Sequence, residues 1–257
     1  MTYPTLTTAL AFDIPPAGAH IVITDELEAE GNFLLHHFIA QFVKSRKSVV
    51  IVGFSQVLVH YDQCLRKMGV NLKEARQSGY VHFVDGLTSL HATQQEGSEP
   101  ATSSADATLR GSSLKDFYEV IKSYMGNGGL IVIDDLSALL YSGWSVLEVN
   151  QWSKALLRMA EKTGGCVVTL THADDTLAGD MDQEALLNSL LHSADYVLQT
   201  RALSSGRSRD VHGQLTLARG PRFCTKRLSG FEGRTLQYKL MDNNVQFFAK
   251  GYSSGVL

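Results

Sequence analysis

Gly128-Gly129-Leu130-Ile131-Val132-Ile133-Asp134-Asp135 is the stretch that decides the fold. Its four consecutive apolar residues, followed by two carboxylates, are typical of a parallel strand that is buried on both faces and ends at a polar edge. Open α/β sheets bind their ligands in the crevice beyond the carboxyl ends of the strands. The stretch therefore predicts an α/β fold with a candidate site at Asp134.

The segments before this strand alternate between two patterns. Short apolar runs predict strands, and apolar residues repeated at helical spacing predict helices. The predicted strands cover 20–24, 48–54 and 80–84, and the predicted helices cover about 32–45, 57–68 and 114–125. This alternation indicates a central, mostly parallel sheet that is flanked by helices.

The segments after the central strand continue the alternation and then change. A long helix over 144–162, a strand over 166–171 and a short helix over 183–192 are predicted. From Tyr196 the sequence instead alternates like antiparallel strands joined by turns. These strands are predicted over 197–201, 211–218, 235–241 and 245–249.

The domain organisation follows from length and local composition. The 257 residues suit one large domain with a substantial core. Residues 1–18 are polar and contain prolines, so we expect an N-terminal arm before a single domain over 19–257. Residues 93–113 are rich in Ser, Thr, Gly, Ala and Gln, which predicts a mobile surface loop. Residues 196–257 form the antiparallel, basic C-terminal part.

The overall composition indicates a soluble globular protein, with 44% apolar and 19% charged residues. No apolar run approaches the roughly 20 residues of a membrane span, and no basic n-region of a secretory signal precedes residue 18. Three cysteines, widely spaced and odd in number, fit reduced thiols in a cytosolic or nuclear protein. We therefore expect no membrane partner and no cysteine metal knuckle.

The net charge of −3 hides an asymmetry along the chain. From Arg201 onward there are ten Lys/Arg and three Asp/Glu, a net charge of +7, whereas residues 1–200 carry a net charge of −10. The C-terminal part is therefore the candidate surface for a polyanion.

The loop over 204–209 is the centre of this basic region. Its Ser and Gly residues predict flexibility, and its guanidinium groups could contact RNA phosphates. The predicted RNA-binding residues are Arg207, Arg209, Arg219, Arg222, Lys226 and Arg227. A solvated loop or a subunit contact explains the same residues equally well, because arginine is also favoured at protein interfaces.

The segment after the first strand lies where a phosphate-binding loop would be. Such a loop needs Gly-x-x-x-x-Gly-Lys-Ser/Thr. Aligning its second glycine with Gly31 puts Glu26 at the first glycine, Asn32 at the lysine and Phe33 at the magnesium-binding hydroxyl. The sequence therefore predicts a degenerate nucleotide site composed of Glu26, Gly31, Asn32, Phe33 and Asp134, with no catalytic residue, no metal and no cofactor.

Electrostatics also disfavour a phosphate there, because the loop carries several carboxylates. Two unit charges about 5 Å apart repel by roughly 3 kcal/mol at an effective dielectric of about 20. That is a large share of the ~8 kcal/mol that a micromolar site supplies. Two interpretations of Asp134 and Asp135 remain: carboxylates that cap the turn after a strand, which is the commoner role, or ligands of Mg²⁺.

Two further groups contain histidine. His36 and His37 are adjacent on a predicted helix and face different directions, so they are poor joint metal ligands, and an ordinary core or surface role is expected. His172 and Asp174 follow a strand at the crevice edge, where a catalytic pair is conceivable. No nucleophile with a recognisable spacing accompanies them.

The order of elements, the strand that ends in Asp134-Asp135 and the late antiparallel strands resemble a RecA-like domain without its phosphate loop. The tail resembles, more specifically, the family of the sixth Elongator subunit. The similar motifs are Arg209-Asp210-Val211-His212-Gly213-Gln214-Leu215, Tyr238-Lys239, Val245-Gln246-Phe247-Phe248-Ala249-Lys250-Gly251, Phe33-Leu34-Leu35-His36-His37-Phe38, Asp134-Asp135-Leu136-Ser137 and Gly255-Val256-Leu257. The resemblance spans nearly the whole chain.

This resemblance implies a RecA-like subunit in a hetero-hexameric ring with Elongator subunits four and five, within the complex formed with the remaining Elongator subunits. It implies that the ring binds tRNA and serves wobble-uridine (U34) modification, with catalysis in another subunit. Because this sequence departs from a nucleotide-binding pattern at Glu26, Asn32 and Phe33, we expect a non-catalytic subunit. The alternative is a divergent RecA-like ATPase that regulates tRNA release.

Overall fold

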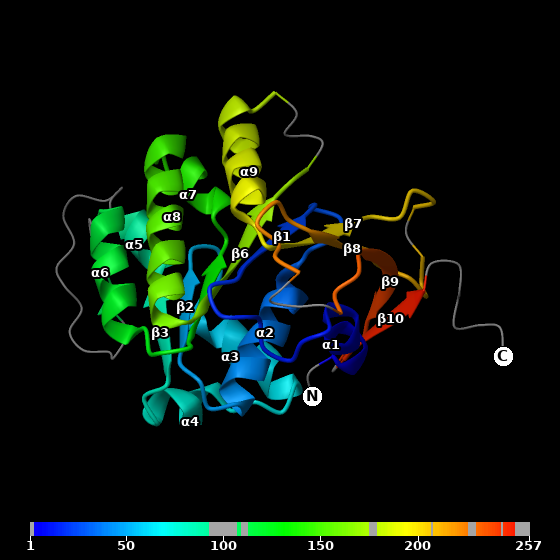
Figure 1. Ribbon diagram of the computed structural model, residues 1–257, viewed down its shortest axis with the longest axis horizontal. Helices are drawn as coiled ribbons and strands as arrows, with labels where there is room; N and C mark the ends of the chain where they lie inside the picture. Colours follow the sequence, from blue (N-terminus) through cyan, green and yellow to red (C-terminus); the bar gives the residue numbers. More distant parts are fainter. Residues whose placement is uncertain are drawn as a thin grey trace.

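The protein is a layered α/β structure with one central sheet and helices on both of its faces (Figure 1). The computed structural model describes residues 3–92, 107–108, 113–174, 179–206, 208–225, 230–242 and 244–249. Within these residues ten strands form a single sheet in the order β10-β9-β8-β7-β1-β6-β5-β2-β3-β4. The strands are β1 His20–Asp25, β2 Val49–Gly53, β3 Val81–Asp85, β4 Ala107–Thr108, β5 Leu130–Asp134, β6 Cys166–His172, β7 Tyr196–Arg201, β8 Gly213–Arg219, β9 Arg234–Leu240 and β10 Val245–Ala249.

The helices divide between the two faces of the sheet (Figure 1). One face is covered by α1 Pro4–Leu10, α2 Asn32–Lys44, α3 Leu58–Lys67 and α4 Leu72–Gln77. The other is covered by α5 Gly86–Ala92, α6 Leu114–Tyr124, α7 Ser137–Tyr141, α8 Val146–Thr163 and α9 Met181–Ser193. None of the helices in the described part of the chain is long and apolar enough to cross a membrane.

Strand β5 confirms the interpretation of the apolar run. All five of its residues are buried. Leu130 and Val132 belong to the core under α2 and α3, whereas Ile131 and Ile133 belong to the core under α6 and α8. Side chains alternate between the faces of a strand, so a continuous apolar run is what a sheet covered on both sides requires.

Parallel pairing extends one strand further than expected. Strand β7 pairs parallel with β1 on one side and antiparallel with β8 on the other. The antiparallel C-terminal part therefore begins with the pairing of β7 and β8 and continues through β9 and β10. The alternating burial of β7, covered on one face and partly open on the other, explains why its sequence resembles that of the antiparallel strands.

The N-terminal segment does not behave as an arm. Its helix α1 has Leu6 and Leu10 fully buried in the core beside α2. The Tyr3 backbone N–H donates to Nδ1 of His37 at 3.2 Å, and the two rings stack with centroids 5.3 Å apart. Seven residues are too few to show a helical period clearly, and the packing of two leucines one turn apart decides the structure.

Most of the predicted mobile loop, residues 93–106 and 109–112, lies outside the described residues. Its Ala107 and Thr108 pair with the end of β3 as the edge strand β4. Ser113, at its end, caps α6: its side chain and that of Asp116 each accept a backbone N–H from the other residue.

Candidate functional site

The carboxyl ends of β1, β2, β5 and β6 border a cavity of about 240 Å³. Its described lining includes Asp25, Glu26, Glu30, Asn32, Asp134 and His172, and it contains no lysine or arginine. The parallel strands place these groups together because their carboxyl ends meet at one edge of the sheet.

Asp134 is enclosed by hydroxyl groups. Only 1% of the residue is exposed, and its two carboxylate oxygens accept hydrogen bonds from Ser55 Oγ at 2.8 Å and Tyr61 OH at 2.5 Å. Burial raises the pKa of Asp134 to about 6, although both hydrogen bonds act in the opposite direction. Burial also raises the pKa of Tyr61, so its hydroxyl stays a donor. Both oxygens of Asp134 therefore join the end of β5 to α3 and to the segment after β2.

Asp25, Asp135 and His172 form a second group. Nδ1 of His172 lies 2.6 Å from Asp25 Oδ1, and its Nε2 lies 3.2 Å from Asp135 Oδ2. These hydrogen bonds, to Asp135 first and then to Asp25, raise the pKa of His172 to about 10. At neutral pH the imidazolium therefore lies between two buried carboxylates.

Asp135 and Asp174 cap neighbouring backbone. Asp135 accepts the N–H of Ala138 at the start of α7 at 2.8 Å, which matches the predicted turn-capping role. Asp174, the partner that the sequence suggested for His172, instead accepts the N–H of Leu27 at 2.7 Å.

Two backbone amides of the loop between β1 and α2 are bonded to acceptors on the same segment. The N–H of Gly31 donates to Asp25 Oδ2 at 2.8 Å, and the N–H of Ala29 donates to the carbonyl of Glu26 at 2.8 Å. A Cβ on Gly31 would lie 2.9 Å from Ile23, so glycine is required by close packing. The Asp25 carboxylate thus lies at the N-terminus of α2, the place that suits a bound anion.

The residues aligned with the other loop positions face different neighbours. Glu26 pairs with Arg201 at 3.2 Å and accepts the N–H of Ala202. Asn32 begins α2, and its buried Oδ1 has no hydrogen-bond donor among the described residues. Phe33 is buried against the ring of Tyr238, with centroids 4.9 Å apart.

Three of the six predicted RNA-binding residues lie in the described part of the chain, and two of these already have protein partners. Arg207, Lys226 and Arg227 lie outside the described residues. Arg209 is exposed and forms no ion pair with another described residue. Arg219, at the far end of β8, donates to the carbonyl of Phe231 at 2.6 Å, and Arg222 pairs with Glu161 at 2.5 Å.

Sequence reasoning missed Ser55 and Tyr61. Ser55 follows a predicted parallel strand, so the rule that places ligands beyond strand ends could have identified it. Tyr61 had no such signal, because a tyrosine on a helix is usually explained by the core.

Comparisons with known proteins place this geometry in context. A family model described as Elongation complex protein 6 matches residues 5–242. The protein named Elongator complex protein 6 of Xenopus laevis is 33% identical over 89% of each chain, and that of Homo sapiens is 32% identical over 90% of this chain and 91% of its own. The Schizosaccharomyces pombe homolog is 23% identical, over 93% of this chain and 94% of its own.

Solved structures with little sequence identity share the fold. An uncharacterized protein of Pyrococcus horikoshii has a TM-score of 0.63 at 16% identity and covers 97% of this chain and 98% of its own. A KaiC-like protein of the same archaeon has a TM-score of 0.57 at 13% identity and covers 96% of each chain. The fold is RecA-like, as the sequence predicted.

Proposed function

The chain belongs to the Elongation complex protein 6 family, and from that membership we propose that it is a non-catalytic RecA-like subunit of the Elongator ring. Its partners are Elongator subunits four and five and, through the ring, the remaining subunits. The ring binds tRNA and supports wobble-uridine modification, which is catalysed elsewhere in the complex, in the cytoplasm or nucleus.

The observation that carries the non-catalytic role is the β1–α2 loop. Its Gly31 amide is bonded to Asp25, and the cationic His172 is held by Asp25 and Asp135. No lysine or arginine is among the described residues that line the cavity. A triphosphate would thus meet carboxylates and would displace bonds that already exist, so the degenerate phosphate loop stabilises the fold without nucleotide.

We predict that neither the purified chain nor the assembled ring containing it binds Mg-ATP at this site with a dissociation constant below about 100 µM. That constant corresponds to a binding free energy of roughly 5 kcal/mol. Isothermal titration calorimetry of the wild type and of Asp134→Asn measures this directly. Micromolar binding that the substitution abolishes would instead support the divergent ATPase, and then hydrolysis should be measured.

Assembly with two partners is the next prediction. Leu27 and Leu240, which are 81% and 40% exposed, lie beside a hollow of about 410 Å³, and apolar surface of this kind is commonly covered by another protein. We expect the chain alone to self-associate and its co-expression with Elongator subunits four and five to give one discrete oligomer by native mass spectrometry. A stable monomer that does not bind those subunits would contradict the proposal.

The tRNA contact is tested on the assembled ring. We expect Arg207→Ala with Arg209→Ala to weaken tRNA binding and to reduce the salt dependence by about 0.7–0.9 in log–log slope for each lost phosphate contact. Lys73→Ala, an exposed charge on α4, is the matched control and should change neither quantity. Filter binding at two salt concentrations, after sizing of each ring, measures both. Unchanged affinity and slope in the double variant would assign these arginines to a solvated loop or a subunit contact.

A further inference from the structure

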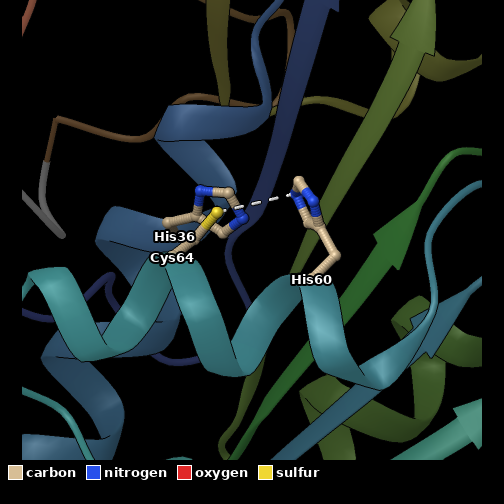
Figure 2. Close-up of side chains that lie close together, drawn as sticks. All are labelled: His36, His60 and Cys64. Atoms are coloured by element: carbon tan, nitrogen blue, oxygen red, sulfur yellow. Dashed lines mark hydrogen bonds between the residues drawn. The ribbon is translucent and has the colours of Figure 1, made fainter. Parts of the chain in front are cut away.

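Three side chains with metal-binding atoms meet between α2 and α3. His36 comes from α2, and His60 and Cys64 come from α3. All three ligand atoms lie within 4.8 Å of one another, and Figure 2 shows the side chains converging in the space between the two helices. His60 and Cys64 are four residues apart, so they share one face of α3.

The separation of the two α3 side chains fits a metal site. Cys64 Sγ lies 3.7 Å from His60 Nε2 (Figure 2). In a tetrahedral zinc site the sulfur and nitrogen ligands are about 3.6 Å apart, given bond lengths of about 2.3 Å and 2.0–2.1 Å. His36 completes the set from the facing helix after a movement of about 1 Å, which is within the reach of side-chain rotation.

The environment of His36 is a second, independent observation. The residue is only 7% exposed, yet no described residue forms a hydrogen bond with its ring, which contacts the rings of His60 and Tyr61. Its ring nitrogens therefore keep their capacity to bind a ligand.

We propose that His36, His60 and Cys64 bind a transition-metal ion of the zinc class, with a fourth position open to water or to a residue of another protein. Mixed nitrogen and sulfur ligands in tetrahedral geometry favour Zn²⁺ over the hard cations Mg²⁺ and Ca²⁺. The Cys64 thiol releases its proton to solvent as the metal–thiolate bond forms, while the two imidazoles bind as neutral ligands. His60 and Cys64 are half-buried, which gives the ion an entry path.

The site would join α2 to α3 close to the crevice. Tyr61, the neighbour of His60, donates to Asp134, so an ion held by His60 would fix the helix that positions this donor. The sequence suggested no metal site because it set His36 against the adjacent His37, whereas the structure pairs His36 with residues 24 and 28 positions further along the chain.

The test uses the full chain, stripped of metal with a chelator and titrated with Co²⁺ and then Zn²⁺. We expect a thiolate-to-cobalt charge-transfer band and the visible bands of a four-coordinate ion, both removed when Zn²⁺ displaces Co²⁺. Cys64→Ser, His60→Asn and His36→Leu should each weaken Zn²⁺ binding at least about 100-fold, since even residues that merely orient ligands contribute 10–100-fold. Cys224→Ser and His192→Asn, outside the cluster, are matched controls and should change neither the Co²⁺ bands nor the Zn²⁺ affinity.

Alkylation of the unsubstituted protein gives a readout that no folding defect can mimic. Zn²⁺ should slow the alkylation of Cys64 but not that of Cys224, as followed by peptide mass spectrometry. Two results would overturn the proposal and leave a simple contact between Cys64 and His60. One is a charge-transfer band that persists in Cys64→Ser, and the other is wild-type Zn²⁺ binding no tighter than that of a variant carrying Cys64→Ser, His60→Asn and His36→Leu together.

Discussion

Replacing His172 with leucine is expected to lower the free energy of unfolding at pH 7 by about 3 kcal/mol. The substitution removes the shared cation of Asp25 and Asp135, whose side chains are only 2% and 6% exposed. Removing one partner of a buried ion pair typically costs 3–5 kcal/mol, and we take the lower end because the His172 side chain is 35% exposed and so partly screened by solvent. Urea denaturation of the wild type and the variant measures the difference.

The pH dependence separates charge from packing. The pKa of His172 is raised from 6.5 to about 10 in the folded protein, so its contribution is fully present below pH 6.5 and is lost as the pH rises through 10. The difference in the free energy of unfolding between the wild type and His172→Leu should therefore become smaller between pH 7 and pH 10. A gap that stays constant would assign the loss to packing alone.

Two variants complete this experiment. His192→Leu, an exposed histidine on α9, is the matched control and should change stability by less than about 0.5 kcal/mol. Adding Asp135→Asn to His172→Leu removes one of the two facing charges and should restore about 1 kcal/mol or more, because asparagine can still accept the N–H of Ala138. A further loss in the double variant would contradict the electrostatic explanation.

The sequence predicts most of the fold because a strand that is buried on both faces of the sheet shows this in its own residues, as an uninterrupted apolar run. Leu130 to Ile133 is apolar without interruption, and the capping pair Ser145 and Glu148 begins the predicted long helix. Helix α1 was missed because its evidence is the burial of Leu6 and Leu10 in the core, which a short segment does not reveal. Local patterns predict elements well and their packing partners poorly.

The site is less predictable because its contacts join distant parts of the chain. Asp25 and His172 lie side by side because β1 and β6 are neighbours and these two residues are directly paired in the register. The sequence shows a carboxylate at one strand end and a histidine at another, but the strand order that joins them is not readable from either. The same holds for Tyr61, which reaches Asp134 from a helix 73 residues earlier.

Acidification is expected to destabilise the protein strongly between pH 7 and pH 5, because three histidines are buried in neutral form. His20, His36 and His37 are 1%, 7% and 0% exposed. Burial lowers the pKa of His20 to about 4 and those of His36 and His37 to about 3. Each histidine has its ordinary pKa of about 6.5 in the unfolded chain, so below pH 6.5 the unfolded state binds protons that the folded state does not.

The sizes of the individual contributions show that acidification to pH 5 lowers the total free energy of unfolding. At pH 5 each of these histidines costs about 2 kcal/mol, or roughly 6 kcal/mol together. Asp134 acts in the opposite direction: its pKa is raised to about 6, so the folded state takes up a proton as the pH falls through 6. This uptake recovers only about 1 kcal/mol at pH 5, so a net loss of several kcal/mol remains.

The variant His36→Leu isolates the contribution of one of the three histidines to the acid sensitivity. It does so because removing the His36 ring breaks no hydrogen bond to a described residue. In metal-free protein the variant should lose about 2 kcal/mol less than the wild type between pH 7 and pH 5, whatever its stability at pH 7. His192→Leu, whose histidine is exposed, should follow the wild-type profile. Urea denaturation at pH 7, 6 and 5 gives all three profiles. If the His36→Leu profile runs parallel to that of the wild type, the folded protein admits a proton at His36, and the acid sensitivity must come from His20 and His37.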